Sequence, residues 1–145
     1  MPGDAEPSHY LRMVEHNLDV LRLLSESARR AAPPTDVSDW KCTLLFYMAC
    51  IYVKALGKFR HKDLQGHYEL RQWLNGTPDL LGITKPYRKL EERSRDARYE
   101  GRRFTAQETA ESLRWFCTIR DSLSSLLKAG GVGQIPAIDP SPHLT

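Results

Sequence analysis

The residues best suited to chemistry follow a long apolar stretch, in a polar segment between residues 58 and 71. An imidazole can take a proton from a ribose hydroxyl, and a guanidinium can stabilise the charge that develops on a phosphoryl group. Arg60 and His67 are therefore the candidate catalytic pair of a metal-independent ribonuclease, with His67 as general base and Arg60 as phosphate stabiliser. The alternative is a solvated linker whose histidines have no chemical role. The residues of this segment that are candidates for nucleic-acid binding are Lys58, Arg60, His61, Lys62 and Arg71.

A second group lies further along the chain, at Arg95, Arg98 and Tyr99. Arginine can pair with phosphate through two parallel hydrogen bonds, and an aromatic ring offers a face on which a base can stack. These three residues are therefore candidates for nucleic-acid binding. In the alternative, Arg98 pairs with a carboxylate inside the protein and Tyr99 covers one end of the fold.

The charge of the chain is unevenly distributed. Residues 54–71 carry a net charge of +3 and residues 85–103 carry +4, whereas the whole chain carries +3, so the remainder sums to −4. A concentration of positive charge on one surface is typical of proteins that bind polyanions. Basic side chains that merely solvate exposed helix faces would produce the same pattern.

No metal or cofactor chemistry is indicated by the sequence. His9 and His16 are seven residues apart, and the group His61, Asp63 and His67 matches no zinc-ligand spacing, so we expect no metal site. The chain has no glycine-rich phosphate loop, no Gly-x-Ser-x-Gly turn and no dinucleotide-binding motif, so we expect no cofactor.

The cysteines and the N-terminal segment bear on the compartment. Cys42, Cys50 and Cys117 lie among apolar neighbours in predicted helices, which favours free thiols in a reducing environment. The N-terminal segment MPGDAEPS has neither a basic start nor an apolar run, so we predict no signal peptide. We therefore expect a cytoplasmic protein.

The element that must position these groups is the apolar stretch from Trp40 to Phe59. Ten residues, 44–53, run without a charge, and a helix that is apolar all round must be covered by other helices or by lipid. A membrane span needs about 20 apolar residues, so the stretch is interpreted as the central helix of a bundle. A buried strand is the alternative, but strands of this kind usually end after about eight residues.

The other elements are predicted from periodicity and from helix-capping residues. A first helix runs from Pro7 or Ser8 to just before Pro33, and a short helix covers roughly 66–74. The third helix begins at Thr84 and ends at Gly101, and a Thr105–Glu108 capping box begins a fourth helix that ends at Gly130. The inward stripe predicted for the fourth helix is Ala110, Leu113, Phe116, Ile119, Leu123 and Leu126.

Together these elements predict an all-α protein of one domain. The fold is an antiparallel, up-and-down four-helix bundle with a short extra helix between helices 2 and 3. The bundle covers residues 1–131, and residues 132–145 form an irregular C-terminal tail.

The chain resembles small bacterial and archaeal HEPN-like proteins over about residues 9–127. The resemblance rests on Asp39-Trp40 leading into Phe46-Tyr47, on a linker that contains histidine, and on a third helix with Ala97-Arg98-Tyr99. It implies a bundle of four or five helices, a homodimer, and an RNA, nucleotide or toxin–antitoxin partner. Many such proteins are metal-independent endoribonucleases whose Arg–His pair lies near the start of the last long helix, whereas here Arg60 and His67 lie in the linker.

Two functions are consistent with these observations. The first is an RNA- or nucleotide-binding protein of the HEPN-like type, with endoribonuclease activity or a toxin–antitoxin role as its specific forms. The second is a non-catalytic interaction module that acts through dimerisation or through a cognate, antitoxin-like protein. Only the first requires the basic residues of the linker and of the third helix to lie on a common surface.

Overall fold

A computed structural model describes residues 6–145, and all regular structure in that range is helical. The first five residues of the predicted domain and of the segment MPGDAEPS lie outside the described part. The elements are α1 (Pro7–Arg30), α2 (Ser38–Phe59), α3 (His67–Gly76), α4 (Leu81–Glu100) and α5 (Ala106–Ala129), with short 3₁₀ turns η1 (Pro78–Leu80) and η2 (Ser141–His143).

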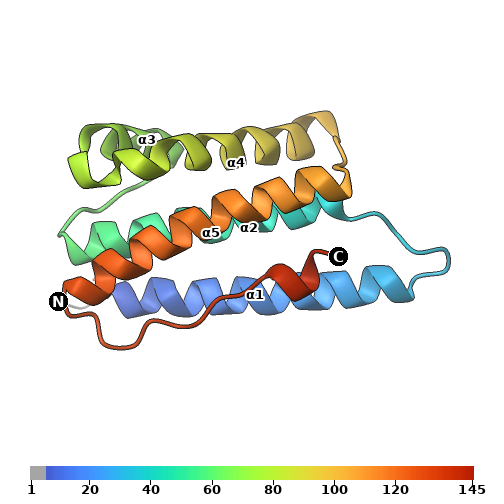
Figure 1. Cartoon of the computed structure of the whole chain (residues 1–145), viewed down its shortest axis with the longest axis horizontal. Helices are drawn as coiled ribbons and strands as arrows, with labels where there is room; N and C mark the ends of the chain where they lie inside the picture. Colours follow the sequence, from blue (N-terminus) through green and yellow to red (C-terminus); the bar gives the residue numbers. More distant parts are fainter. Residues whose placement is uncertain (1–5) are drawn as a thin grey trace.

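The long helices alternate in direction along a common axis, as an up-and-down bundle requires (Figure 1). α2 packs against α1, α4 and α5, and α4 also packs against α5. The short helix α3 lies beside the first half of α4 and touches α2. The prediction of a helical bundle with an extra helix between helices 2 and 3 is confirmed.

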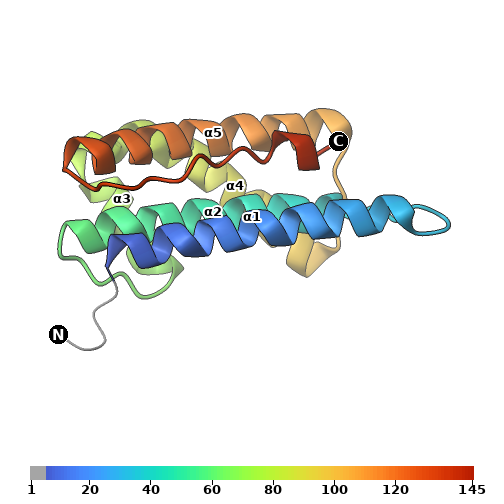
Figure 2. The ribbon, with the colours of Figure 1, turned by 90° about the horizontal axis from the view of Figure 1, so that it is seen from below.

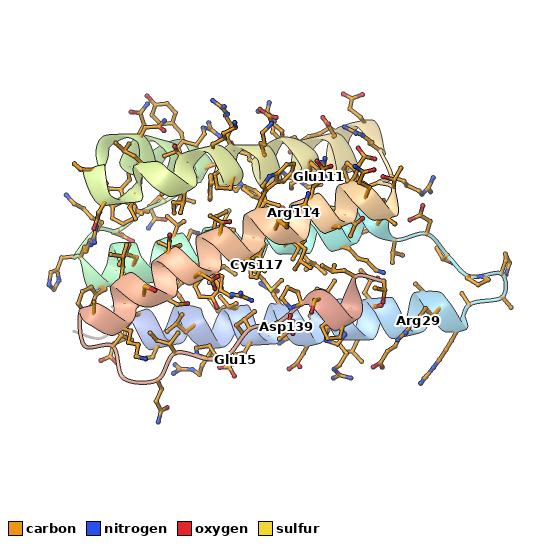
Figure 3. The ribbon with its side chains drawn as sticks, in the orientation of Figure 1. Glu15, Arg29, Glu111, Arg114, Cys117 and Asp139 are labelled. Carbon is orange, nitrogen blue, oxygen red and sulfur yellow. The ribbon has the colours of Figure 1, made fainter. Side chains whose placement is uncertain are left out.

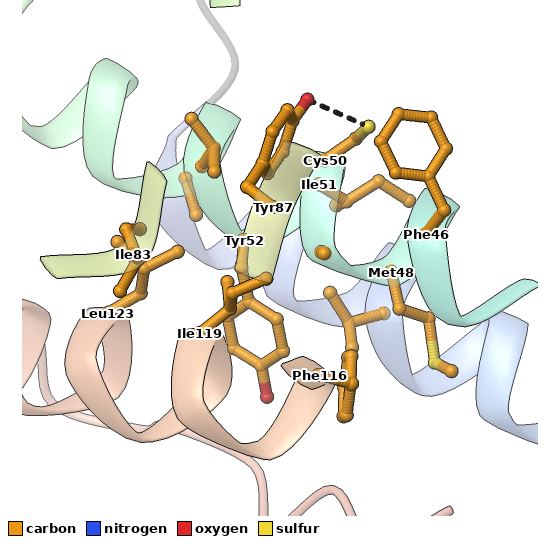
Figure 4. Close-up of a cluster of buried hydrophobic side chains, with 14 of the residues drawn as sticks. Phe46, Met48, Cys50, Ile51, Tyr52, Ile83, Tyr87, Phe116, Ile119 and Leu123 are labelled. Carbon is orange, nitrogen blue, oxygen red and sulfur yellow. Dashed lines mark hydrogen bonds between the residues drawn. The ribbon is translucent and has the colours of Figure 1, made fainter. Parts of the chain in front are cut away.

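α2 is central because its side chains face neighbours on nearly every side. Phe46 and Tyr87 meet edge to face with ring centroids 5.5 Å apart, and the Cys50 Sγ lies 3.2 Å from the Tyr87 hydroxyl (Figure 4). α2 is long and apolar enough to cross a membrane. However, 72% of its most apolar 18-residue segment is buried within the bundle. The buried apolar residues of α2 are Cys42, Leu45, Phe46, Met48, Ala49, Cys50, Ile51, Tyr52, Val53, Ala55 and Leu56.

The helix ends follow the predicted signals in most places. Thr105 and Glu108 form a complete capping box at the start of α5, each side chain accepting a hydrogen bond from the other residue's backbone N–H. Gly101 ends α4 in the left-handed region, with φ of 64°. At Gly130 a Cβ atom would overlap the tip of the Phe59 ring, so any other residue here would force that ring to move.

Two helices differ from the prediction in detail. α4 begins at Leu81 instead of Thr84, because η1 leads directly into it, and Pro86 lies inside the helix near its start. In the first half of α5, Thr109 and Ser112 face inward instead of Ala110 and Leu113. These small polar side chains leave room for neighbours: the Ser112 hydroxyl lies 3.6 Å from the Cys42 sulfur, and donates to the Glu108 carbonyl at 3.1 Å.

The C-terminal tail is irregular apart from η2 and runs back along the bundle beside α1 and α5 (Figures 1 and 2). Ile138 is buried, and Arg120 of α5 donates a hydrogen bond to its carbonyl at 2.7 Å. The tail and α5 therefore cover one side of the molecule. Figure 2 shows the linker between α2 and α3 on the opposite side of α1 and α2.

Candidate functional site

The side of the bundle away from α5 holds most of the groups suited to chemistry. The linker turns back at His61, with φ of 59°, and at Gly66, with φ of 113°, and so returns the chain to the middle of α2. α3 then begins at His67, whose imidazole lies 5.5 Å from the Phe46 ring between centroids. Leu70 and Leu74, one turn apart, are buried and fix α3 against the bundle.

Arg71 forms an ion pair with Glu91 across the contact between α3 and α4. The Arg71 Nη1 donates to the Glu91 Oε2 at 2.8 Å. The Glu91 side chain is 7% exposed, whereas that of Arg71 is 40% exposed, so the carboxylate depends on the arginine more than the arginine depends on it.

Arg98 of α4 is held against α2 without a carboxylate partner. Its Nη1 donates to the Tyr47 hydroxyl at 3.1 Å, and its Nε donates to the Ser94 carbonyl at 3.2 Å. The guanidinium also lies over the rings of Tyr47 and Tyr99, at 5.6 and 5.2 Å from their centroids. Within residues 6–145 no acidic side chain pairs with Arg98, so its positive charge is not neutralised.

His67 lies within the electrostatic reach of cations from three helices. His67 is exposed as a whole residue, but desolvation by the groups packed against its ring lowers the pKa of the imidazole most. The charges of Arg98, Arg71 and Lys54 lower it further, while Glu91 opposes them. The ring is therefore neutral at neutral pH and able to accept a proton. His67, Arg71 and Arg98, together with Lys54, are called the basic face.

A cleft of about 130 Å³ opens between α3 and α4, next to the basic face. Three of its lining residues are cationic and none is acidic. Lys85 and Arg88 have no ion-pair partner in the described part of the chain, while Arg71 pairs with Glu91. The lining residues are Arg71, Leu74, Asn75, Thr84, Lys85, Tyr87 and Arg88.

Arg60 lies apart from this arrangement. Its guanidinium forms two hydrogen bonds to the Asp79 carboxylate, of 2.9 and 2.5 Å, and these bonds raise the pKa of Arg60. No contact between Arg60 and His67 is present in residues 6–145, and Arg60 is not among the charges that act on the imidazole. The catalytic pairing of Arg60 with His67 thus stays a prediction without a geometric basis.

The other predicted binding residues fall in two places. Lys58 is half-buried near the end of α2, and His61 and Lys62 are exposed in the turn that follows. Arg95 and Tyr99 are exposed near the end of α4, where they line a hollow together with Glu92, Asp96 and Glu100. This hollow is more acidic than basic, so Arg95 adds little positive field there.

Several residues of the site were not singled out from the sequence. Lys85, Arg88 and Glu91 belong to the basic segment 85–103, and Arg88, Glu91 and Arg98 share one helical stripe through steps of three and seven residues. Helical spacing could therefore have identified that stripe. The contribution of α3 to the site could not have been identified from the sequence, because it depends on where the linker places α3 against α2 and α4.

Comparison of the chain with protein-family models, curated proteins and solved structures finds no match. The HEPN resemblance therefore stays a prediction. Among residues 6–145 no three histidine, cysteine, aspartate or glutamate side chains are grouped so as to hold a metal ion.

Proposed function

We propose that this protein binds single-stranded RNA through its basic face. The observation that carries the proposal is that Lys54, Arg71 and Arg98, from three different helices, all act electrostatically on the His67 imidazole, with Glu91 opposing them. Bringing like charges together is unfavourable unless an anion balances them, and a phosphate backbone supplies such anions at regular intervals.

The state of Arg98 supports the same conclusion. Nearby arginines of the bundle are neutralised by carboxylates: Arg93 pairs with Glu111 at 3.1 Å, and Arg102 pairs with both Asp96 and Glu108. Arg98 is instead oriented by a phenol and a carbonyl, which leave its charge available. A guanidinium held in place but not neutralised is preorganised for phosphate.

Exposed aromatic rings beside these cations favour a single strand over a duplex. Tyr99 is 73% exposed and lies against the Arg98 guanidinium, and Tyr68, which follows His67 in the chain, is 67% exposed. Unpaired bases stack on such rings, whereas the bases of a duplex are already stacked on one another. Endoribonuclease activity and a toxin–antitoxin role stay predictions beyond this binding function.

The test measures the affinity for a short oligouridine with hydroxyl ends, by fluorescence anisotropy across a range of salt concentrations. The variant is Arg98→Gln, which removes the charge and keeps much of the side chain. We expect the affinity to fall about fivefold at 0.1 M salt, and the slope of log K against log salt to shrink by about 0.7, the contribution of one phosphate on a single strand.

The matched control is Arg114→Gln on α5. Arg114 is an exposed arginine on the face of α5 turned toward the viewer in Figure 3, opposite the linker side. We expect this variant to bind as the wild type does. If both substitutions weaken binding equally, the attraction is a general charge effect, and if the wild type ignores RNA at low salt, the proposal is wrong.

A second candidate function is a non-catalytic interaction module that forms a homodimer. The observation that favours it is the exposure of large apolar side chains on α1 and at the start of α2: Met13 is 39% exposed, and Leu23 and Trp40 are each 54% exposed. Exposed apolar side chains on neighbouring helices are typical of protein interfaces.

A further inference from the structure

The cleft between α3 and α4 is closed at its base by side chains of the core. Leu74 and Tyr87 line it and are each only 1% exposed. The Thr84 hydroxyl donates its hydrogen to the Leu81 carbonyl at 2.9 Å. It can therefore accept a hydrogen bond from a ligand in the cleft but cannot donate one. The donors that remain are the cations and the Asn75 amide.

The charges of the cleft are suited to an anion. Arg71 uses Nη1 to bond Glu91 at 2.8 Å, and this bond fixes the guanidinium while leaving its other N–H groups without a partner within residues 6–145. Lys85 and Arg88, on successive turns of α4, are exposed and unpaired in that same range. Three cations thus converge from two helices with no carboxylate in the lining.

The size of the cleft limits what can occupy it. Sites for drug-sized ligands are typically about 300–1,000 Å³, whereas one water molecule needs about 10–15 Å³. A volume of about 130 Å³ therefore admits a phosphoryl group but not a nucleotide chain that enters and leaves.

We infer that the α3–α4 cleft binds a terminal phosphomonoester. A phosphomonoester carries about −1.5 to −2 charges at neutral pH, against one for an internal phosphodiester, and has three terminal oxygens for the converging donors. The group is the end phosphate of an RNA strand or the phosphate of a mononucleotide. The first source rests on the proposed RNA-binding function. Arg71 belongs to both the cleft and the basic face, so the two sites adjoin and the end of a strand bound on that face is within reach of the cleft.

The experiment compares one oligouridine in three forms: with a 5′-phosphate, with a 3′-phosphate and with hydroxyl ends. We expect one phosphorylated form to bind about tenfold more tightly than the hydroxyl form, the effect of a well-placed charged hydrogen bond. This ratio should fall close to one in the double variant Lys85→Ala/Arg88→Gln. Both side chains are exposed, so the variant should fold normally, which circular dichroism checks.

The matched control is Arg98→Gln, which should weaken both forms and leave the ratio unchanged. Uridine monophosphate as a competitor distinguishes the two sources: if it removes the advantage of the phosphorylated strand, the cleft accepts the free nucleotide as well. If it does not, the cleft requires a strand end.

Failure of this inference is distinct from failure of RNA binding. A ratio near one in the wild type, or a raised ratio that persists in the double variant, overturns the cleft assignment even when RNA binds. If no RNA form binds but uridine monophosphate shifts the amide resonances of α3 and α4 in the wild type and not in the double variant, the cleft assignment stands without the RNA function.

Discussion

Glu91 and Arg98 are two charged residues on one stripe of α4, and their charges have different kinds of partner. Glu91 is nearly buried and needs the cation of Arg71, whereas Arg98 lies at a more open edge and is held by neutral groups. The sequence indicated that Arg98 must have a partner, and offered an internal carboxylate or an anionic ligand. A tyrosine hydroxyl on α2 was not foreseen, because no pattern in the chain links residues 47 and 98.

His67 yields a prediction about protonation. The imidazole should titrate below its ordinary value of 6.5, because burial and the neighbouring cations disfavour its charged form. Proton NMR of the ring, assigned with His67→Gln, measures this midpoint. Adding oligouridine should raise the midpoint, since phosphate near the ring favours the charged form; a midpoint that does not move would place the RNA elsewhere.

The same depressed pKa gives a sign for stability. The unfolded chain binds a proton at His67 more readily than the folded chain, so the contribution to stability is present above pH 6.5 and declines as the pH falls below it. The thermal midpoint of the wild type should therefore drop more between pH 7 and pH 5.5 than that of His67→Gln. His16→Gln, an exposed histidine on α1, is the control.

The helices differ in how far the sequence determined them. The central position of α2 was predictable because a long run without charges must be buried by other helices. The start of α5 was predictable because its capping box is formed by two residues only three apart in the sequence. The inward face of the first half of α5 was not, because Thr109 and Ser112 are inward on account of the close packing at Cys42, a tertiary effect that overrides apolar periodicity. The docking of α3 depends on Leu70 and Leu74, which fix where His67 meets α2 and where Arg71 meets α4.

The docking of α3 can be tested through the ion pair between Arg71 and Glu91. Arg71→Ala leaves a carboxylate that is 7% exposed without its cation, and should lower the free energy of unfolding by about 3 kcal/mol. Glu91→Gln leaves an arginine that water can still reach, and should cost about 1 kcal/mol. Urea denaturation measures both values.

The double variant Arg71→Ala/Glu91→Gln is the control for this asymmetry. It should be more stable than Arg71→Ala alone, because the amide that replaces the carboxylate is cheaper to leave buried without a cation. Equal costs for the two single variants would mean that water reaches Glu91 in solution and that the pair does not fix α3.

At the scale of the whole molecule, the helix order leaves three unlike surfaces. α5 and the tail close one side of the bundle (Figure 2). The basic face and the adjacent cleft belong to the side of α3 and α4, and α1 with the start of α2 presents apolar side chains. Charge and apolarity are thus separated around the bundle. A polyanion and a protein partner could be bound at the same time, so the two candidate functions do not exclude each other.

The apolar surface of α1 and α2 is suited to a second copy of the chain. A 24-residue helix is about 36 Å long, so the outer side of α1, extended by Trp40 at the start of α2, offers a long strip to a second copy. The charges of α1 are nearly balanced, with Arg12, Arg22, Arg29 and Arg30 against Glu15, Asp19 and Glu26, so two copies would not repel strongly.

We therefore expect light scattering to give twice the chain mass of 16.6 kDa, and Leu23→Glu to return the protein to the monomer by burying a charge at the interface. The matched control is Leu81→Glu, since Leu81 is 55% exposed, almost the same as Leu23, but lies at the start of α4. Dissociation by both substitutions alike would point to a different interface, and a wild-type mass of one chain would leave the apolar side chains of α1 without a homodimeric role. A monomeric Leu23→Glu variant that still binds oligouridine would further establish that the basic face is complete within one chain.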